Sequence, residues 1–169
     1  MATASETPEQ YRSRLAGYVG AGDFLKLQAE APHALAQLIA GASEEKLQQR
    51  PAPDKWSVVE ILAHLAEDEL SSSWRYRQIL EHDEPTLSGF DQEKWAALGD
   101  YPTWNSGEAL EMFRLLREAN LRMLRRLTPA QWERSGVHVE RGRITVRELA
   151  RHMAAHDINH IKQIEKLLT

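Results

Sequence analysis

The sequence predicts an all-α protein, a four-helix bundle with up-down-down-up topology. Apolar residues recur with the helical period along most of the chain, while the alternation typical of strands is nearly absent. Four segments are long enough to form the helices of a bundle. One connection, between the second and third segments, is far longer than the loops of about 2 to 8 residues that usually join antiparallel helices.

Length and composition limit the class of protein. The chain has 169 residues and no cysteine, so we expect residues 1–169 to form a single domain without disulfides, thiolate metal ligands or a cysteine nucleophile. The net charge of -4 and the scattered arginines disfavour nucleic-acid binding. Because no apolar stretch approaches the ~20 residues of a membrane span and no signal peptide is recognisable, we expect a cytoplasmic protein that does not contact membranes.

The N-terminal part of the chain is expected to precede the bundle. Residues 1–22 are predicted to form a short helix, around Tyr11 to Tyr18, and a linker that contains "GAG". The first long helix follows, from about Asp23 to Ala42. Pro32 lies inside this segment and predicts a kink or a restart, because proline is tolerated only in the first turn of a helix.

The second long helix is predicted from about Ser57 to Glu81. It follows "PAPDKWS", in which the prolines block helix formation and the serine can cap the new helix. The next stretch, His82 to Asn105, is then the long crossover between helices two and three. It contains "FDQEKWAALG", which is expected to form a short helix of its own.

The third helix is predicted from about Ser106 to Leu127, and the fourth from about Thr145, after the bend "ERGRI", almost to Thr169. The starts of helices two and four form a weak repeat, in which "SVVEILAHLAEDE" aligns with "TVRELARHMAAHD". Both begin with a capping box, in which the cap hydroxyl and a glutamate three residues later accept each other's backbone N–H.

Histidines on the core-facing sides of two helices are the candidate metal ligands. His156 and His160 lie one turn apart within the apolar stripe of the fourth helix, with His152 at its edge, and His64 borders the stripe of the second helix. If these helices run antiparallel, His64, His156 and His160 lie at a similar depth and can bind one ion. The alternative for each is a hydrogen-bonded core histidine, and His152 is expected to orient a ligand or to be solvated.

Acidic residues accompany these histidines. Asp68 and Glu69 lie in the stripe of the second helix, and Asp157 follows a candidate ligand in the fourth. Asp68 is predicted to hydrogen-bond a ligating histidine or to act as a base, with a structural ion pair as the alternative. Glu69 and Asp157 are expected to be structural, because Arg117 and Asn120 on the third helix can pair with buried acids.

For the remaining arginines and histidines of interest, the sequence gives less specific predictions. Arg75 and Arg77 could bind an anionic substrate or cover the surface. The remaining histidines, His33, His82 and His138, have no matching core positions and are predicted to lie at the surface or in loops.

Two of these segments resemble a known family. "KWSVVEILAHLAEDE" and "HDINHIKQI" are similar to motifs of the DinB superfamily (DinB/YfiT-like proteins), and "RPAPDKWS" and "ERGRITVRELA" extend the resemblance from about Arg50 to the C-terminus. The resemblance implies an up-down-down-up bundle, a homodimer, and a divalent ion such as zinc, nickel or iron bound by His64, His156 and His160. It also implies a transferase that uses bacillithiol, mycothiol or glutathione, or a related isomerase.

The resulting functional hypothesis is a metal-dependent transferase that activates a low-molecular-weight thiol. Three neutral imidazoles leave a divalent ion with open positions, where a bound thiol loses its proton near neutral pH. A non-catalytic stress-related protein with a structural metal and a metal-dependent hydrolase are the alternatives. An open position beside a pocket favours an enzyme, and a closed four-ligand site favours a structural role.

Overall fold

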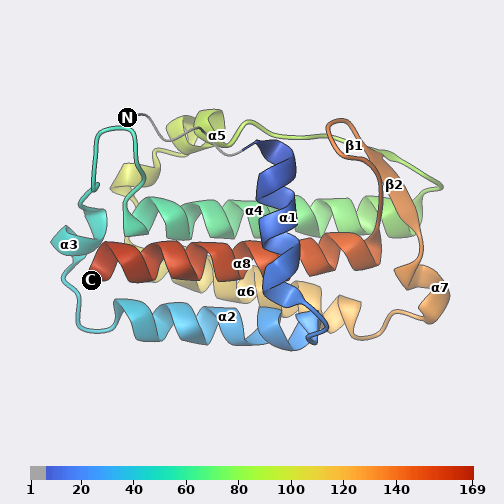
Figure 1. Ribbon diagram of the computed structural model, residues 1–169, viewed down its shortest axis with the longest axis horizontal. Helices are drawn as coiled ribbons and strands as arrows, with labels where there is room; N and C mark the ends of the chain where they lie inside the picture. Colours follow the sequence, from blue (N-terminus) through green and yellow to red (C-terminus); the bar gives the residue numbers. More distant parts are fainter. Residues whose placement is uncertain (1–6) are drawn as a thin grey trace.

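The structure, a computed structural model, describes residues 7–169, so positions 1–6 of the predicted N-terminal segment lie outside the described residues. Long helices that lie side by side form the bundle (Figure 1). They are α2 (Phe24–Ile39), α4 (Val58–Glu81), α6 (Ser106–Leu124) and α8 (Val146–Leu168). The predicted up-down-down-up topology is confirmed, since α4 and α6 run in one direction while α2 and α8 run in the other. Each of α2 and α4 packs against both α6 and α8.

Proline inside α2 interrupts the hydrogen bonding of the helix without ending it. Of the two alternatives predicted at Pro32, a kink or a restart, the restart is wrong, because α2 is continuous from Phe24 to Ile39. A proline has no N–H to donate to the carbonyl four residues earlier, here that of Gln28. Nη1 of Arg117 on α6 donates to this carbonyl oxygen at 3.0 Å. The free carbonyl of α2 therefore has a buried partner on the neighbouring helix.

Both predicted capping boxes are present. The Ser57 hydroxyl accepts from the backbone N–H of Glu60 at 3.3 Å, and the Glu60 carboxylate accepts from that of Ser57 at 2.9 Å. Thr145 and Glu148 repeat this arrangement at the start of α8, at 3.1 and 2.8 Å. These caps fix where α4 and α8 begin, and so fix the register of the histidines that follow.

The connection from α4 to α6 returns along the outside of α4, as Figure 1 shows. It contains β1 (Thr86–Leu87), α5 (Gln92–Leu98) and the 3-10 helix η1 (Tyr101–Thr103). This is the predicted crossover with its short helix, and it allows α4 and α6 to be parallel neighbours.

A small sheet covers one end of the bundle. β2 (Ser135–His138) pairs with β1 in parallel, with Thr86 opposite Val137, and with β3 (Gly142–Thr145) in antiparallel, with Gly136 opposite Ile144. The protein is therefore mostly helical, but the bend predicted at "ERGRI" is part of a hairpin. These strands have two to four residues, too few to show a periodic pattern in the sequence.

Shorter helices complete the fold. α1 (Pro8–Val19) crosses α8 at a steep angle (Figure 1) and packs Leu15 and Val19 against Ala154 and Ala155. α3 (Glu44–Gln48) and α7 (Pro129–Trp132) lie in the connections at opposite ends of the bundle. Among residues 7–169, no helix is long and apolar enough to cross a lipid bilayer.

The bundle core has apolar regions toward its two ends and a polar layer between them. Leu62 and Phe113 belong to the apolar cluster near α3, and Ile79 and Leu124 belong to the cluster near the sheet. Burying polar groups costs free energy unless they find partners. The polar layer consists of His64, Asp68, Glu69, Ser72, Arg117, Asn120, His156, Asp157 and His160, all of them buried.

Candidate metal centre

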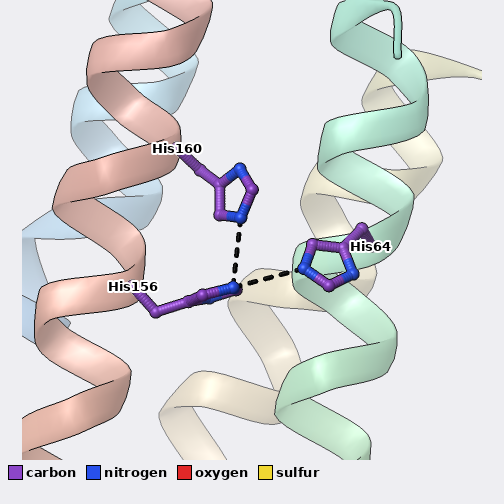
Figure 2. Close-up of side chains that lie close together, drawn as sticks. All are labelled: His64, His156 and His160. Atoms are coloured by element: carbon purple, nitrogen blue, oxygen red, sulfur yellow. Dashed lines mark hydrogen bonds between the residues drawn. The ribbon is translucent and has the colours of Figure 1, made fainter. Parts of the chain in front are cut away.

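Three imidazole rings converge in the polar layer of the bundle. His156 and His160 come from one face of α8, one turn apart, and His64 comes from the antiparallel helix α4 (Figure 2). Nε2 of His156 lies 3.2 Å from Nε2 of His64 and 3.1 Å from Nε2 of His160. One nitrogen from each ring lies within 4.8 Å of the other two. The structure thus brings together the three histidines that the sequence singled out.

Hydrogen bonding alone does not account for this arrangement. The Nε2 of a neutral imidazole offers one in-plane position, either a lone pair or a proton. Nε2 of His156 therefore cannot bond both of its neighbours well. Two ligands of a tetrahedral ion with metal–nitrogen distances of about 2.0 to 2.1 Å lie about 3.3 Å apart. The two measured separations are close to this value, so the three rings fit a divalent ion.

Groups around two of the rings favour the tautomer that binds a metal through Nε2. Nδ1 of His160 lies 3.0 Å from Oε1 of Gln163, an acceptor, which favours a proton on this nitrogen. Nδ1 of His156 lies 3.4 Å from Oδ2 of Asp68, a contact longer than a hydrogen bond but favourable for an N–H at this position. Both Nε2 atoms are left with lone pairs that face each other, which is favourable when a cation lies between them.

The third ring has a different environment. Nδ1 of His64 is buried and has no hydrogen-bond partner among residues 7–169. Its ring packs against that of Trp56, with a centroid separation of 5.0 Å. On the Nδ1 side, packing against Trp56 takes the place of a hydrogen bond in orienting this imidazole.

The three imidazoles are neutral at physiological pH. Burial, together with the neighbouring His64, lowers the pKa of His160 to about 3. Burial and the other histidines lower the pKa of His156 well below its usual value, and burial lowers that of His64. Metal ligation requires unprotonated imidazole, so the site needs no costly deprotonation before an ion binds.

The acids of the polar layer divide into two environments. Arg117 lies 2.9 Å from Glu69 and makes a two-pronged contact with Asp157 at 2.5 and 3.0 Å. Asn120 donates to Glu69 at 2.8 Å. The predicted pairing of these acids with helix three is confirmed, and the two carboxylates hold the pKa of Arg117 above its usual value. Of the three acids, Asp68 is the one that lies against a histidine of the cluster.

A cavity of about 520 Å³ lies beside the histidine cluster. His64, His156 and Asp68 contribute to its wall, so the cluster borders open space and is not enclosed on all sides by protein. Burial raises the pKa of Asp68, against the opposing effects of His64 and Arg75. Further lining residues are Tyr11, Arg75, Gly89, Phe90, Gln92, His138, Glu140, Arg141, Leu149, His152 and Met153.

The sequence did not reveal all residues of this cavity. His138 was predicted to lie at the surface or in a loop, but it is buried at the end of β2. The strand directs Gly136 and His138 inward and exposes Val137, and Val139 beyond the strand is exposed too. This reverses the usual placement of apolar and polar residues in a strand. The alternation in "VHV" predicts valines that face inward, so it does not identify His138 as buried. Arg141, in the hairpin turn, had no signal in the sequence either.

Other expectations can be placed in the structure. Arg75 lines the cavity, whereas Nη1 of Arg77 donates to the carbonyl of Ser73 and to Oδ1 of Asn120. His152 lines the cavity without joining the cluster, and Nη2 of Arg141 lies 3.0 Å from its Nδ1. The remaining two histidines, His33 and His82, are exposed as predicted.

The fold and the site define a helical-bundle protein with a three-histidine cluster beside an open cavity. Residues 29–164 match the model of the DinB superfamily, and the chain belongs to this family. It is 27% identical over 149 residues to a protein of Oceanobacillus iheyensis named "putative metal-dependent hydrolase", covering 87% of this chain and 84% of that one. It is 25% identical over 145 residues to the protein of the same description, YfiT, from Bacillus subtilis, covering 85% and 82%.

A solved structure has the same fold. The structure of Bacillus subtilis YfiT, described as a probable metal-dependent hydrolase with an unusual four-helix bundle topology, superposes with a TM-score of 0.80. The superposition covers 99% of this chain and 90% of that one at 23% sequence identity. At this identity the likeness supports the bundle topology.

Proposed function

We propose that this protein is a metal-dependent enzyme that binds a divalent ion through His64, His156 and His160 and activates a small nucleophile beside it. The observation that carries the proposal is the convergence of the three histidines, two of which, His64 and His156, line an open cavity. Among the described residues, no acid or further histidine joins this group as a fourth ligand. An open position beside a cavity is typical of catalytic metal sites, whereas structural sites are closed.

Residues of the chain have defined tasks in this proposal. The three histidines hold the ion through nitrogens that burial keeps unprotonated. The carboxylate of Asp68, 3.4 Å from Nδ1 of His156, favours a proton on this nitrogen and so keeps Nε2 available for the ion. A divalent ion at this position supplies a Lewis acid that lowers the pKa of a water or thiol in its open position.

We propose a low-molecular-weight thiol as the nucleophile. The chain has no cysteine, so the thiol comes from a cosubstrate. In the reaction the thiol would give its proton to solvent, its sulfur would form a bond to an electrophilic carbon, and the leaving group would depart with the electron pair of the broken bond and take up a proton from solvent. The described cavity, of about 520 Å³, is large enough for both reactants.

Hydrolysis is the second candidate, favoured by the names of the relatives from Oceanobacillus iheyensis and Bacillus subtilis. The same site would then activate water in place of a thiol. A non-catalytic protein with a structural ion is less well supported, because the cluster lies at an open cavity.

Elemental analysis followed by two assays tests the proposal. Wild type and His160→Ala are purified with zinc, nickel and iron available, and their metal content is measured. Metal in the wild type, loss of metal in the variant, and metal-dependent consumption of a thiol together with an electrophile support the transferase. Metal-dependent cleavage of esters or amides without thiol consumption supports the hydrolase. A wild type that neither contains nor is stabilised by a divalent ion contradicts both.

We also propose the homodimer that the family resemblance implies. Sedimentation velocity at micromolar concentration measures it, with a species of twice the chain mass of 19.3 kDa as the expected result.

A further inference from the structure

The cavity continues from the histidine cluster toward the sheet, and its lining there is basic. Arg75 comes from α4, His138 and Arg141 from the β2–β3 hairpin, and His152 from the start of α8. Arg75 lies seven residues beyond Asp68, or about 10 Å along the helix axis at 1.5 Å per residue. The basic end of the cavity is therefore separate from the position of the proposed ion.

Arg75 is held in place by neutral groups. Its Nε and Nη2 donate to the carbonyl oxygen of Ser88, at 3.3 and 2.8 Å, and its guanidinium lies 5.6 Å from the ring centre of Phe90. Among residues 7–169, no carboxylate forms an ion pair with it. The guanidinium of Arg75 is thus held in a fixed orientation by neutral groups, and no carboxylate of the described residues pairs with its charge.

Arg141 approaches the same space from the hairpin. Its Nη2 donates to His152, and burial together with this guanidinium lowers the pKa of His152 to about 3, so the imidazole is a neutral acceptor. Nδ1 of His138 accepts from the backbone N–H of Glu140 at 3.2 Å, which leaves the proton of a neutral ring on Nε2 as a donor. Burial and the two arginines lower the pKa of His138.

Acidic groups also face this space. The carboxylate of Glu140 lies against Gly89, where its Oε1 is 2.9 Å from the position a Cβ would take. Asp68 lies deeper, against His156. Glu140 is exposed at the rim, so solvent weakens its effect on an anion bound further inside.

From this arrangement we infer that the basic end of the cavity binds a carboxylate group of the thiol cosubstrate, with Arg75 and Arg141 as its partners and His138 as a neutral donor. The inference rests on the proposed function for the position of the sulfur, at the histidine cluster. Guanidinium groups suit carboxylates because their N–H groups match the two carboxylate oxygens. The substrate class is therefore a thiol with a carboxylate several bonds away from the sulfur.

A pair of thiols that differ only at one end tests this inference. Mercaptohexanoate and mercaptohexanol have the same chain, but only the first carries a carboxylate. They are titrated into cobalt(II)-loaded protein, where the sulfur-to-cobalt absorption band reports binding without turnover. We expect the wild type to bind mercaptohexanoate at least about tenfold more tightly than mercaptohexanol, the effect of one charge-assisted pair.

Variants of the two arginines assign this difference to the proposed subsite. Arg75→Met and Arg141→Met are each expected to weaken mercaptohexanoate binding about tenfold and to leave mercaptohexanol binding within twofold. Arg77→Met, on the same helix, and Arg143→Met, on the same hairpin, are matched controls outside the cavity and are expected to bind both thiols like the wild type. Glu140→Gln is expected to strengthen mercaptohexanoate binding alone.

The outcomes separate the subsite from the metal centre. Equal affinity of the two thiols in the wild type, or an equal loss for both thiols in the Arg75 and Arg141 variants, overturns the inference. A protein that takes up no cobalt refutes the proposed function instead, and hexanoate is then titrated into the metal-free protein. Shifts of the Nε–H resonances of Arg75 and Arg141 in NMR spectra support the subsite in that case, and their absence overturns it.

Discussion

Replacing His160 by alanine is expected to remove most of the stability that a divalent ion gives to this protein. Nε2 of His160 lies 3.1 Å from Nε2 of His156, and Gln163 favours a proton on its other nitrogen. The variant removes one of three proposed ligands and leaves the other two in place. The change is internal to α8 and alters no contact of the Arg117 ion pairs.

The size of the effect follows from linkage between binding and folding. At a free metal concentration 100 times its Kd, an ion that binds only the native state stabilises it by about 2.7 kcal/mol. For a chain of this length, about 1 kcal/mol raises the Tm by about 2 to 4 °C, so the wild type is expected to gain about 5 to 10 °C. Loss of a group that supports a ligand can weaken metal binding by roughly 100-fold, and loss of a ligand itself is expected to weaken it at least as much. At the same metal concentration the variant then gains about 0.4 kcal/mol, or under about 2 °C.

Thermal unfolding with and without added zinc, nickel or iron(II) measures this difference. Each variant is compared with its own metal-free form, so any change in intrinsic stability cancels. His33→Ala is the matched control, because His33 is an exposed histidine on α2, and it is expected to keep the full shift. A His160→Ala protein that gains as many degrees as the wild type would refute the assignment of this residue as a ligand.

Three further predictions concern buried side chains with polar groups. Arg117→Met leaves two buried carboxylates uncompensated and is expected to lower the free energy of unfolding by about 3 to 5 kcal/mol in urea titrations, whereas Arg114→Met, at exposed ion pairs, leaves it nearly unchanged. A loss below about 1 kcal/mol at Arg117 would contradict the ion-paired network. In metal-free protein His160 has a folded pKa of about 3, below its unfolded value of about 6.5, so its contribution to stability is present above about pH 6.5 and is lost as the pH falls. His160→Gln is therefore expected to reduce the pH dependence of the unfolding free energy between pH 6 and 4 by about 1.4 kcal/mol per unit, and an unchanged slope argues against a buried neutral imidazole. The Tyr76 hydroxyl is buried without a hydrogen-bond partner in the described part of the chain, so Tyr76→Phe is expected to leave the free energy of unfolding unchanged or to raise it by up to about 1 kcal/mol. Tyr101→Phe loses a hydrogen bond to a glutamate of α4 and is expected to lower it by about 1 to 2 kcal/mol. Urea titrations compare the two variants, and a larger loss for Tyr76→Phe contradicts this ranking.

The sequence determined the helices of the bundle and the faces that their histidines occupy. Helical periodicity and the caps at Ser57 and Thr145 predicted where α4 and α8 begin, and the structure confirms both. Because the direction of a side chain on a helix follows from its position along the chain, His156 and His160 could be assigned to the core and separated from His152. The length of the connection between α4 and α6 predicted that these helices are parallel, and hence that α4 runs antiparallel to α8.

Only the tertiary structure decided which partners these side chains have. Asp68 and Glu69 are neighbours in the sequence and both lie in the stripe of α4, but Arg117 on α6 contacts Glu69 while Asp68 faces His156. The direction of a residue on its own helix does not specify what the opposite helix presents, so the sequence left the role of Asp68 open.

The basic end of the cavity also depends on the tertiary structure. His138 and Arg141 belong to a hairpin whose strands are too short for a recognisable period, and it packs where α4 and α8 meet the sheet. Pairing between residues far apart in the sequence, such as Val137 with Thr86, positions this hairpin. Local propensity determined the helices and the histidine register, whereas long-range strand pairing determined which charges share the cavity with the histidines.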